Sequence, residues 1–458
     1  MRAGARLCTL LAAALGCAAP PWMAPPEPAP LPRLEGGAGR PAHVLLVSVS
    51  GLTPDRYLSG IAMPTLARLA GLGVAAESVV PVAAAGVYPA HATFVTGVTP
   101  AQHGIVADDL LGERGVRRAQ PSHASQLRSA TLWQRVAEGG GTVASLDWPT
   151  TTGAEIASLL PDLSPQRESE RWPALVADAA TPWIGERVRA AAPAVEQPGP
   201  ARDALLVDLA CAALAQSPRL ILLRLRGPEA PLLASGPSSP EAAAAFGAAD
   251  EQIARLLRCA EQAGVLGQSA FVVLGDRAFV PVHTALRPNV LLQGEGLITA
   301  QGRWKAFARS NGASACVYAD EARTALDARR RLDTAARDSG AYRIVSAEDM
   351  IARGADPDAW FGLQAEPGFL FENDYAGPAL SAAPVRASAG ALLGEAAPPT
   401  GLVAFGRGIR SGVRVPRMHQ LDVAPTLAAL LGAKLETATG HDLVGLLRLS
   451  PEAPSGGR

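Results

Sequence analysis

The sequence predicts an α/β protein with a doubly wound, mostly parallel sheet, flanking helices and a smaller inserted subdomain. Three nearly continuous apolar runs of strand length are typical of strands buried on both faces, as in parallel sheets. They span residues 44–49, 219–225 and 271–277. Helical patterns lie between them, and this alternation is lost only from residue 286 to about 384. The lost alternation indicates an insertion into the sheet domain.

The individual elements follow in chain order. The first strand ends at Ser50-Gly51, and the next helix carries Leu66, Leu69 and Leu72 at helical spacing. We then expect a helix over 131–137, a strand over 142–146, short helices and loops over 161–200, a helix over 202–215, a loop over 227–237, a long helix over 239–260, a charged helix over 320–336, strands near 315–318, 342–345 and 402–409, and a final helical stretch within 418–432.

The first 19 residues have the features of an export leader. Arg2 and Arg6 precede an apolar stretch over 7–16, and small residues surround Cys17. The Pro-rich segment 20–40 should behave as an extended linker. Ala14-Leu-Gly-Cys17 partly resembles a bacterial lipobox, so lipid attachment at Cys17 and ordinary cleavage near Ala19 both stay open. Either way we expect export, to the periplasm or to an anchored position on the outer side of the cytoplasmic membrane.

Composition sets further limits. The chain has 458 residues, 48% of them hydrophobic and 18% charged, which suffices for a large core. The net charge of −1 gives no electrostatic basis for nucleic-acid binding. No apolar run reaches the ~18 residues of a spanning helix. Cys211, Cys259 and Cys316 are interpreted as small buried hydrophobes in preference to disulfide partners.

Motifs along the chain carry a specific resemblance. They are Ser48–Asp55 (SVSGLTPD), Met63–Leu69 (MPTLARL), Val87–His91 (VYPAH), Val95–Gly97 (VTG), His103–Val106 (HGIV) and Met418–Gly432 (MHQLDVAPTLAALLG). Together they resemble the nucleotide pyrophosphatase/phosphodiesterase branch of the alkaline phosphatase superfamily, over about residues 42–447. The resemblance implies an alkaline-phosphatase-like core over 41–285 and 400–450, with 286–399 as a cap subdomain above the carboxyl ends of the strands.

The family's chemistry uses two zinc ions, which clamp the oxygens of a phosphoryl displacement. By resemblance, the family's ligand positions here are Ser50, Val87, Glu229, Leu233, Asp276, Arg277 and Ala389. Val87 also stands where the family has its nucleophilic Thr, and Asp108 where it has the Asn that steadies the oxyanion. A valine can neither ligate a metal nor attack phosphorus. Only two ligand positions keep a carboxylate, so we expect no zinc cofactor.

None of the seven histidines falls at a ligand position. We expect His91 and His103 to be packed or hydrogen-bonded, and His283 is the one possible substitute ligand. Arg277 should pair with Asp276 or Asp108 and supply the positive charge that zinc would bring.

The resulting candidate cleft residues are Ser50, Asp108, Trp148, Glu229, Asp276 and Arg277. Trp148 belongs to a stretch, Asp147–Gly153, that resembles the family's Trp-Pro loop beside the substrate, and for it simple packing is an equal alternative.

Two functions remain open. The first is an exported, catalytically inactive member that acts by binding an unknown small molecule or protein. The alternative is an active phosphoester hydrolase with a metal site rearranged around Asp108, Glu229, Asp276 and His283.

Overall fold

The computed structural model describes residues 30–34, 36–84, 86–117, 119–391 and 397–447. The leader, Cys17 and most of the Pro-rich linker therefore lie outside the described residues. No described helix is both long and apolar enough to cross a membrane.

The core is an eight-stranded sheet with the order β19-β2-β18-β9-β1-β8-β6-β7. The central strand β1 pairs in parallel with β8 and β9, and β6 continues the parallel arrangement to β7. Only β18 runs against its neighbours β9 and β2. This confirms the predicted mostly parallel sheet. Its strands are β1 (His43–Val49), β2 (Val74–Ala76), β6 (Val143–Trp148), β7 (Ser158–Pro161), β8 (Leu220–Leu225), β9 (Ser269–Gly275), β18 (Leu402–Gly406) and β19 (Val413–Val415).

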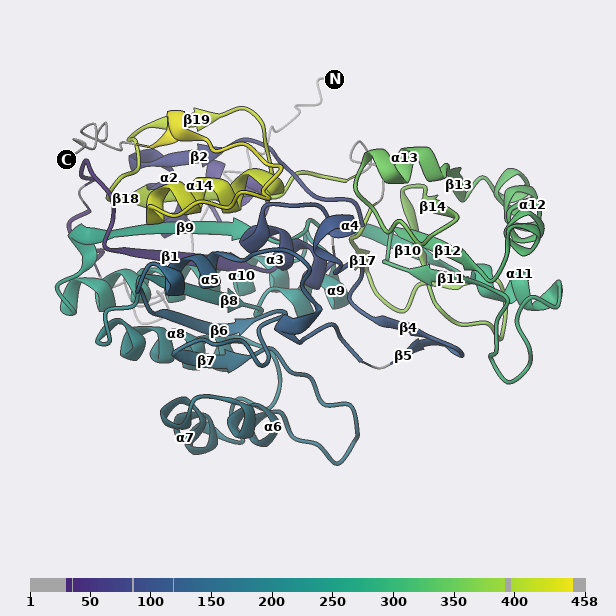
Figure 1. The fold of residues 1–458 in the computed structure, drawn as a ribbon, viewed down its shortest axis with the longest axis horizontal. Coiled ribbons are helices and arrows are strands. Elements are labelled where there is room, and N and C mark those ends of the chain that lie inside the picture. Colours follow the sequence, from purple (N-terminus) through teal and green to yellow (C-terminus); the bar gives the residue numbers. More distant parts are fainter. Residues whose placement is uncertain (1–29, 35, 85, 118, 392–396, 448–458) are drawn as a thin grey trace, which may run out of the picture.

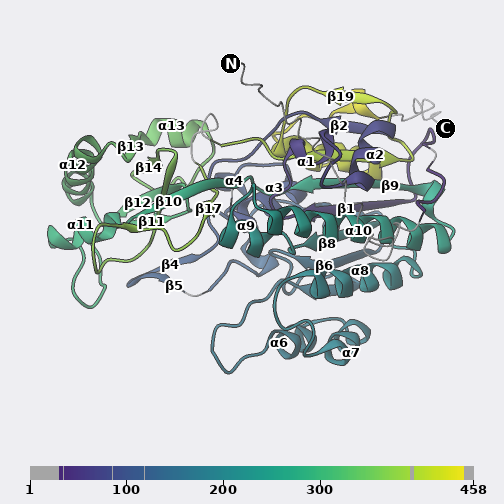
Figure 2. The same ribbon diagram turned by 180° about the vertical axis from the view of Figure 1, so that it is seen from behind.

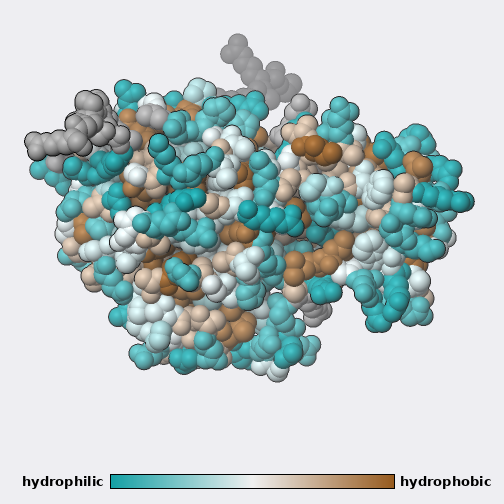
Figure 3. Space-filling model, in the orientation of Figure 1, coloured by the Kyte–Doolittle hydropathy of each residue, from teal (hydrophilic) through white to brown (hydrophobic). Residues whose placement is uncertain are grey.

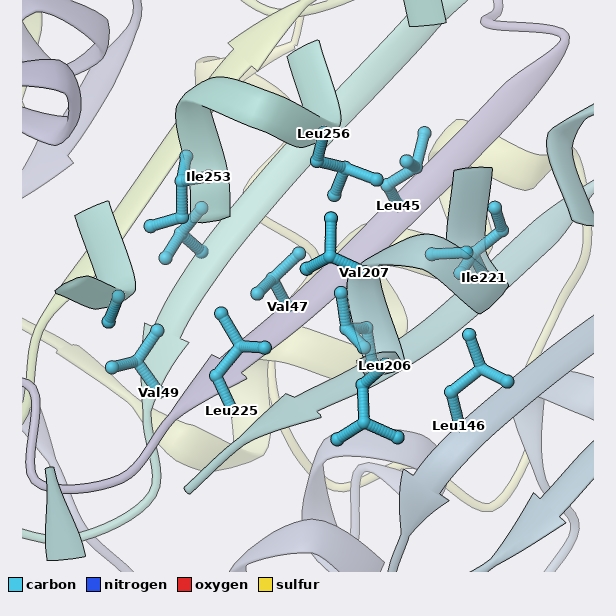
Figure 4. Close-up of a cluster of buried hydrophobic side chains, with 14 of the residues drawn as sticks. Leu45, Val47, Val49, Leu146, Leu206, Val207, Ile221, Leu225, Ile253 and Leu256 are labelled. Atoms are coloured by element: carbon cyan, nitrogen blue, oxygen red, sulfur yellow. The ribbon is translucent and has the colours of Figure 1, made fainter. Parts of the chain in front are cut away.

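Helices cover both faces of this sheet (Figures 1 and 2). One face carries α2 (Pro64–Leu72), α8 (Pro200–Leu214) and α10 (Pro240–Gln262), and the other carries α3 (Val87–Thr96), α5 (Leu132–Glu138) and α14 (Val423–Leu431). Because side chains alternate along a strand, Leu45, Val47 and Val49 point toward α8 and α10 (Figure 4), whereas Val44 and Leu46 point the other way.

The insertion forms a lobe beyond the carboxyl ends of the core strands (Figure 1). It contains a four-stranded antiparallel sheet with the order β11-β12-β14-β13, three helices, and a second sheet around β10. Its elements are β10 (Val280–Leu286), α11 (Pro288–Gly294), β11 (Ala306–Ser310), β12 (Ser314–Ala319), α12 (Ala322–Ser339), β13 (Tyr342–Val345), α13 (Ala347–Ala352), β14 (Phe361–Ala365), β15 (Gly368–Phe371), β16 (Leu380–Ala382) and β17 (Ala387–Ser388).

The partners of β10 all come from the insertion, so in the structure the insertion begins ahead of residue 286. Hydrogen bonds fix the lobe to the core, including Ala101 N–H to the Gly354 carbonyl at 3.0 Å and Trp304 Nε1 to the Gly112 carbonyl at 2.8 Å. The remaining elements are α1 (Pro54–Leu58), β3 (Val79–Val80), α4 (Pro100–His103), β4 (Leu110–Gly112), β5 (Gly115–Arg117), α6 (Trp172–Ala179), α7 (Pro182–Ala191), α9 (Glu229–Ser235), β20 (Met418–His419) and short 3-10 turns at Ala124–Gln126, Leu266–Gln268, Gln420–Asp422 and Val444–Leu446.

The surface offers no large continuous apolar area on the face shown in Figure 3. Hydrophobic side chains there form small patches separated by hydrophilic ones, as is usual for a protein surface.

Two predictions about the core were wrong. The expected loop over 227–237 contains the helix α9, because Glu229–Ser235 forms two turns between Pro228 and Gly236, and these flanking turn residues made the whole stretch resemble a loop. Cys211 and Cys259 are not separate buried thiols. They form a disulfide between α8 and α10, two packed helices that bring the Cα atoms to 5.5 Å. Cys316 is a buried free thiol, as predicted.

Candidate functional site

The candidate site lies where the parallel strands end, the edge of such a sheet that gathers functional residues. Ser50 and Gly51 follow β1, Arg226 follows β8, and Asp276 and Arg277 follow β9. The turn after β1 needs its glycine: Gly51 has a φ of +75°, and an added Cβ would lie 2.4 Å from the Leu232 side chain. This turn presents the Gly51 N–H to Asp276 Oδ1 at 3.0 Å.

Arg277 occupies the centre of the predicted metal positions. Its Nη1 donates to Asp276 Oδ2 at 2.8 Å, and its Nη2 donates to Glu229 Oε1 at 2.6 Å. The side chain is only 9% exposed, and it lies beside the Phe279 ring. One guanidinium therefore joins the two carboxylates that the sequence keeps at ligand positions. The contact with Asp276 was expected from the sequence, and the contact with Glu229 was not.

Both partners of this ion pair are held in their charged forms. Burial would raise the pKa of Glu229, but Arg277, Arg224 and Arg226 outweigh it and lower that pKa to about 2. Burial would likewise lower the pKa of Arg277, but Asp276 and Glu229 outweigh it and raise the pKa. The ion pair is thus ionised throughout the physiological pH range.

Asp108 lies at the amino end of α3. Its Oδ1 accepts the Tyr88 N–H at 2.8 Å, and the Val87 N–H also interacts with it. Gly86 leaves room for it, since an added Cβ there would lie 2.5 Å from Asp108 Oδ1. Burial raises the pKa of this carboxyl, although Arg277 and the two N–H groups oppose the shift. A helix amino end favours an anion, and here the protein's own carboxylate fills that place.

The other predicted ligand positions are apolar or unpartnered. Val87 is buried against Tyr88 and Ile105. Leu233 lies one turn after Glu229 on α9 and packs against the main core. The Ser50 hydroxyl is fully buried, and no residue within the described ranges hydrogen-bonds to it.

Ala389 lines a small hollow together with Arg277.

These residues do not fit a pair of zinc ions. Structural and catalytic zinc sites use about three or four protein ligands per ion, and among the described residues no three His, Cys, Asp or Glu side chains are placed to hold a metal. His283 does not fill the gap. It is exposed on β10 in the lobe, where its ring contacts Thr284 and Phe369.

His91 and His103 are packed and hydrogen-bonded, as predicted. His91 Nδ1 donates to the Val87 carbonyl at 2.7 Å, and its Nε2 accepts from the Ser48 hydroxyl at 2.9 Å. His103 accepts the Ile105 N–H at 3.1 Å, and burial lowers its pKa to about 3. Burial also lowers the pKa of His91, so both rings are neutral and structural.

For Trp148 the structure favours packing over substrate contact. The side chain is fully buried, and its ring meets His91 edge to face at 4.8 Å.

Sequence reasoning missed a second group of charges beside Glu229. Arg224 Nη1 lies 3.2 Å from Asp162 Oδ2, and Arg226 Nη1 lies 3.3 Å from Asp162 Oδ1. The signal was present in the strand pattern. Arg224 and Arg226 are two residues apart at the end of β8, so they share one face, and a charged pair on a buried strand needs carboxylate partners.

Two neighbouring hollows lie between the core and the lobe, and Arg277 lines one of them. The smaller, of about 20 Å³, is lined by Arg277, Ala389 and Gly390. The larger, of about 290 Å³, shares Pro81 and Ala391 with it and extends past apolar side chains. The charged or titratable residues among those described that line the two hollows are all basic: Arg277, Arg353 and His419.

Comparison with known proteins follows this geometry. Residues 44–365 match the family model described as type I phosphodiesterase/nucleotide pyrophosphatase. No curated protein sequence matches the chain. An inactive variant of murine ectonucleotide pyrophosphatase/phosphodiesterase 5, in complex with AMP, is similar in structure with a TM-score of 0.64 and 17% identity, covering 88% of this chain and 99% of that one.

The unaltered murine protein gives the same TM-score, identity and share of this chain, with 100% of its own length covered. The human counterpart gives a TM-score of 0.63 at 17% identity, covering 88% of this chain and 99% of its own. At this level of identity the likeness concerns the fold.

Proposed function

Because the chain belongs to the type I phosphodiesterase/nucleotide pyrophosphatase family, we propose that it is an exported member that acts by binding and does not turn over phosphoesters. The observation that carries this proposal is the place of Arg277. Its guanidinium forms ion pairs with Asp276 at 2.8 Å and with Glu229 at 2.6 Å. Both carboxylates that could otherwise bind a metal are therefore occupied by Arg277.

The loss of the nucleophile supports the same conclusion. Val87 stands at the nucleophile position, and its buried side chain has no atom that can attack phosphorus. Nucleophile and activating groups work as a unit, so losing them together removes nearly all of the chemical rate enhancement. Asp108 adds a second obstacle, because its carboxylate would repel a phosphoryl oxygen at the amino end of α3.

The alternative, a hydrolase with a rearranged metal site, has weaker support. It requires His283 to join Asp108, Glu229 and Asp276. The exposed ring of His283 instead contacts Thr284 and Phe369 within the lobe.

The two hollows suggest what the cleft binds. Asp276 and Glu229 neutralise Arg277, so the positive charge at the hollows comes from Arg353. Together with the apolar walls, it favours a small anionic molecule with an apolar part. The murine relative offers a parallel, since its inactive variant is in complex with AMP. A member of this fold can therefore retain a ligand without turnover.

Export has two independent supports. One is the leader in the sequence. The other is the Cys211–Cys259 disulfide, since such bonds persist mainly in oxidising compartments outside the cytoplasm. If Cys17 carries a lipid, the Pro-rich segment after it would act as a tether to the outer side of the cytoplasmic membrane, ending near Leu31, which packs against the core.

A hydrolysis assay tests the catalytic part of this proposal. Purified wild-type protein, supplied with excess zinc, should release no more product from a chromogenic phosphodiester than Asp276→Ala does. Turnover by the wild type that Asp276→Ala abolishes would establish the rearranged enzyme instead.

A further inference from the structure

The segment Asp147–Gly153 comprises the last two residues of β6 and the turn after it, and its backbone is unusual: the pairing of β6 with β7 is irregular between Leu146 and Trp148. Asp147 has a φ of +57° and Thr150 a φ of +61°. Residues other than glycine rarely adopt this left-handed conformation, and it persists only where surrounding contacts enforce it. Both side chains are buried, with Asp147 fully so. The packing around this segment therefore holds it in a strained state.

The Asp147 carboxyl has a poor environment for a negative charge. Neither of its oxygens accepts a hydrogen bond from any residue that the structure describes. Its nearest cation is Arg226, whose Nη1 lies 3.9 Å from Oδ2, beyond hydrogen-bonding reach. The Thr150 hydroxyl, also buried, has no hydrogen-bond partner within the same described ranges.

Other carboxyl groups lie closer to the neighbouring arginines than Asp147 does. Asp162 takes the direct contacts with Arg224 and Arg226, at 3.2 and 3.3 Å. Glu229 is also close to both: its Oε2 lies 3.6 Å from Arg224 Nη2 and 3.8 Å from Arg226 Nε. Three carboxyl groups thus face two arginines, and Asp147 makes the longest contact.

The other groups that act on Asp147 do not supply a partner. From α8, Arg202 exerts an attraction, but its guanidinium stacks on the Trp172 ring at 3.7 Å and donates to the Val195 carbonyl. From α3, Tyr88 faces Asp162 and Arg224.

We propose that the end of β6 and the turn after it, Asp147–Gly153, form a pH-sensitive element, closed as in this structure when Asp147 is protonated and displaced when the carboxyl loses its proton to water. An ionised, fully buried carboxylate without hydrogen bonds is unfavourable. Leaving the site would both solvate it and release the left-handed backbone at Asp147 and Thr150.

The direction of the titration agrees with the geometry. Burial, and then Asp162, raise the pKa of Asp147 to about 7, against the attraction of Arg226, Arg224 and Arg202. A raised acid pKa means that the folded loop binds the proton more tightly than the open loop does. The closed state should therefore be most favoured below the ordinary Asp pKa of 3.8 and lose ground as the pH rises from there to about 7. This inference is independent of catalysis and of the cleft's ligand.

Hydrogen–deuterium exchange, corrected for the intrinsic pH dependence of the amides, tests it on the full-length protein. In the wild type, protection of a peptide covering 147–153 should fall at least tenfold between pH 5.5 and 8.5, while peptides from β1 keep theirs. Asp147→Asn should stay protected across this range. Thr150→Gly, which accepts the positive φ, should raise protection at every pH but keep the slope.

A wild-type loop whose corrected protection is flat from pH 5.5 to 8.5 would overturn the proposal, whatever the variants do. An unchanged slope in Asp147→Asn would overturn it equally, because another group would then be responsible.

Discussion

Replacing Arg277 with methionine tests the ion pair at the centre of the site. The substitution keeps a long side chain but removes the charge that Asp276 and Glu229 share at 2.8 and 2.6 Å. Breaking a buried pair from one side costs ~3–5 kcal/mol, because a buried charge is left uncompensated. Asp276 keeps two backbone N–H donors, from Gly51 and Arg277 itself. Glu229 keeps Arg224 and Arg226 nearby, so we expect the lower end, about 3 kcal/mol.

The pH dependence of this loss follows from Glu229. Its folded pKa, about 2, lies below the ordinary value of 4.5. A depressed acid pKa contributes stability that is present above the unfolded pKa and is lost as the pH falls through the folded one. The difference between wild type and Arg277→Met should therefore be full at pH 7 and shrink as the pH falls from about 4.5 toward 2.

Equilibrium urea unfolding at pH 7 and pH 3.5 measures both quantities. Adding Glu229→Gln to Arg277→Met should recover part of the loss at pH 7, since the variant no longer buries an unpaired charge. A loss below 1 kcal/mol at pH 7, or a loss that stays the same at pH 3.5, would show that Arg277 does not neutralise these carboxylates.

Three further outcomes are expected. Val87→Thr alone should yield no phosphodiesterase activity in a chromogenic assay. Any gain of activity should require at least Ser50→Asp, Arg277→His, Leu233→His and Ala389→His as well. Activity in the single variant would contradict the conclusion that the site has lost its metal ligands. Cys211→Ser should lower the free energy of unfolding by about 4 kcal/mol, the chain-entropy value for a loop of the observed 48-residue separation. Cys316→Ser serves as a control, because Cys316 forms no disulfide. Equal losses in the two variants would count against the Cys211–Cys259 bond. Fractionation of cells should find wild-type protein with membranes and Cys17→Ala in the soluble exported fraction if Cys17 is lipidated, and equal release of both would rule out the lipid anchor but not export.

The sequence predicted most of the sheet because its strands are buried on both faces. Residues 44–49 and 219–225 are nearly uninterrupted apolar runs, and both became central parallel strands. The helix α9 escaped prediction because Pro228 and Gly236 flank a stretch of only seven residues. The Cys211–Cys259 pairing escaped because it depends on how α8 and α10 dock, and residues 48 apart carry no local signal of that contact.

Within the site, the sequence predicted which positions had lost their chemistry and that Arg277 would pair with a carboxylate. It did not predict that Glu229 would be the second partner, because this contact joins residues 48 apart on different elements. The isolation of Asp147 was equally hidden. It depends on which carboxyl groups approach Arg224 and Arg226 most closely, and these distances cannot be predicted from the sequence.

Zinc content tests the central claim most directly. The protein would be purified without chelator, dialysed against excess zinc and then against zinc-free buffer, and analysed by atomic mass spectrometry. If Arg277 replaces the metals, zinc per chain should be far below one and should be the same in Asp276→Ala. Two zinc ions per chain in the wild type, lost in Asp276→Ala, would contradict the account.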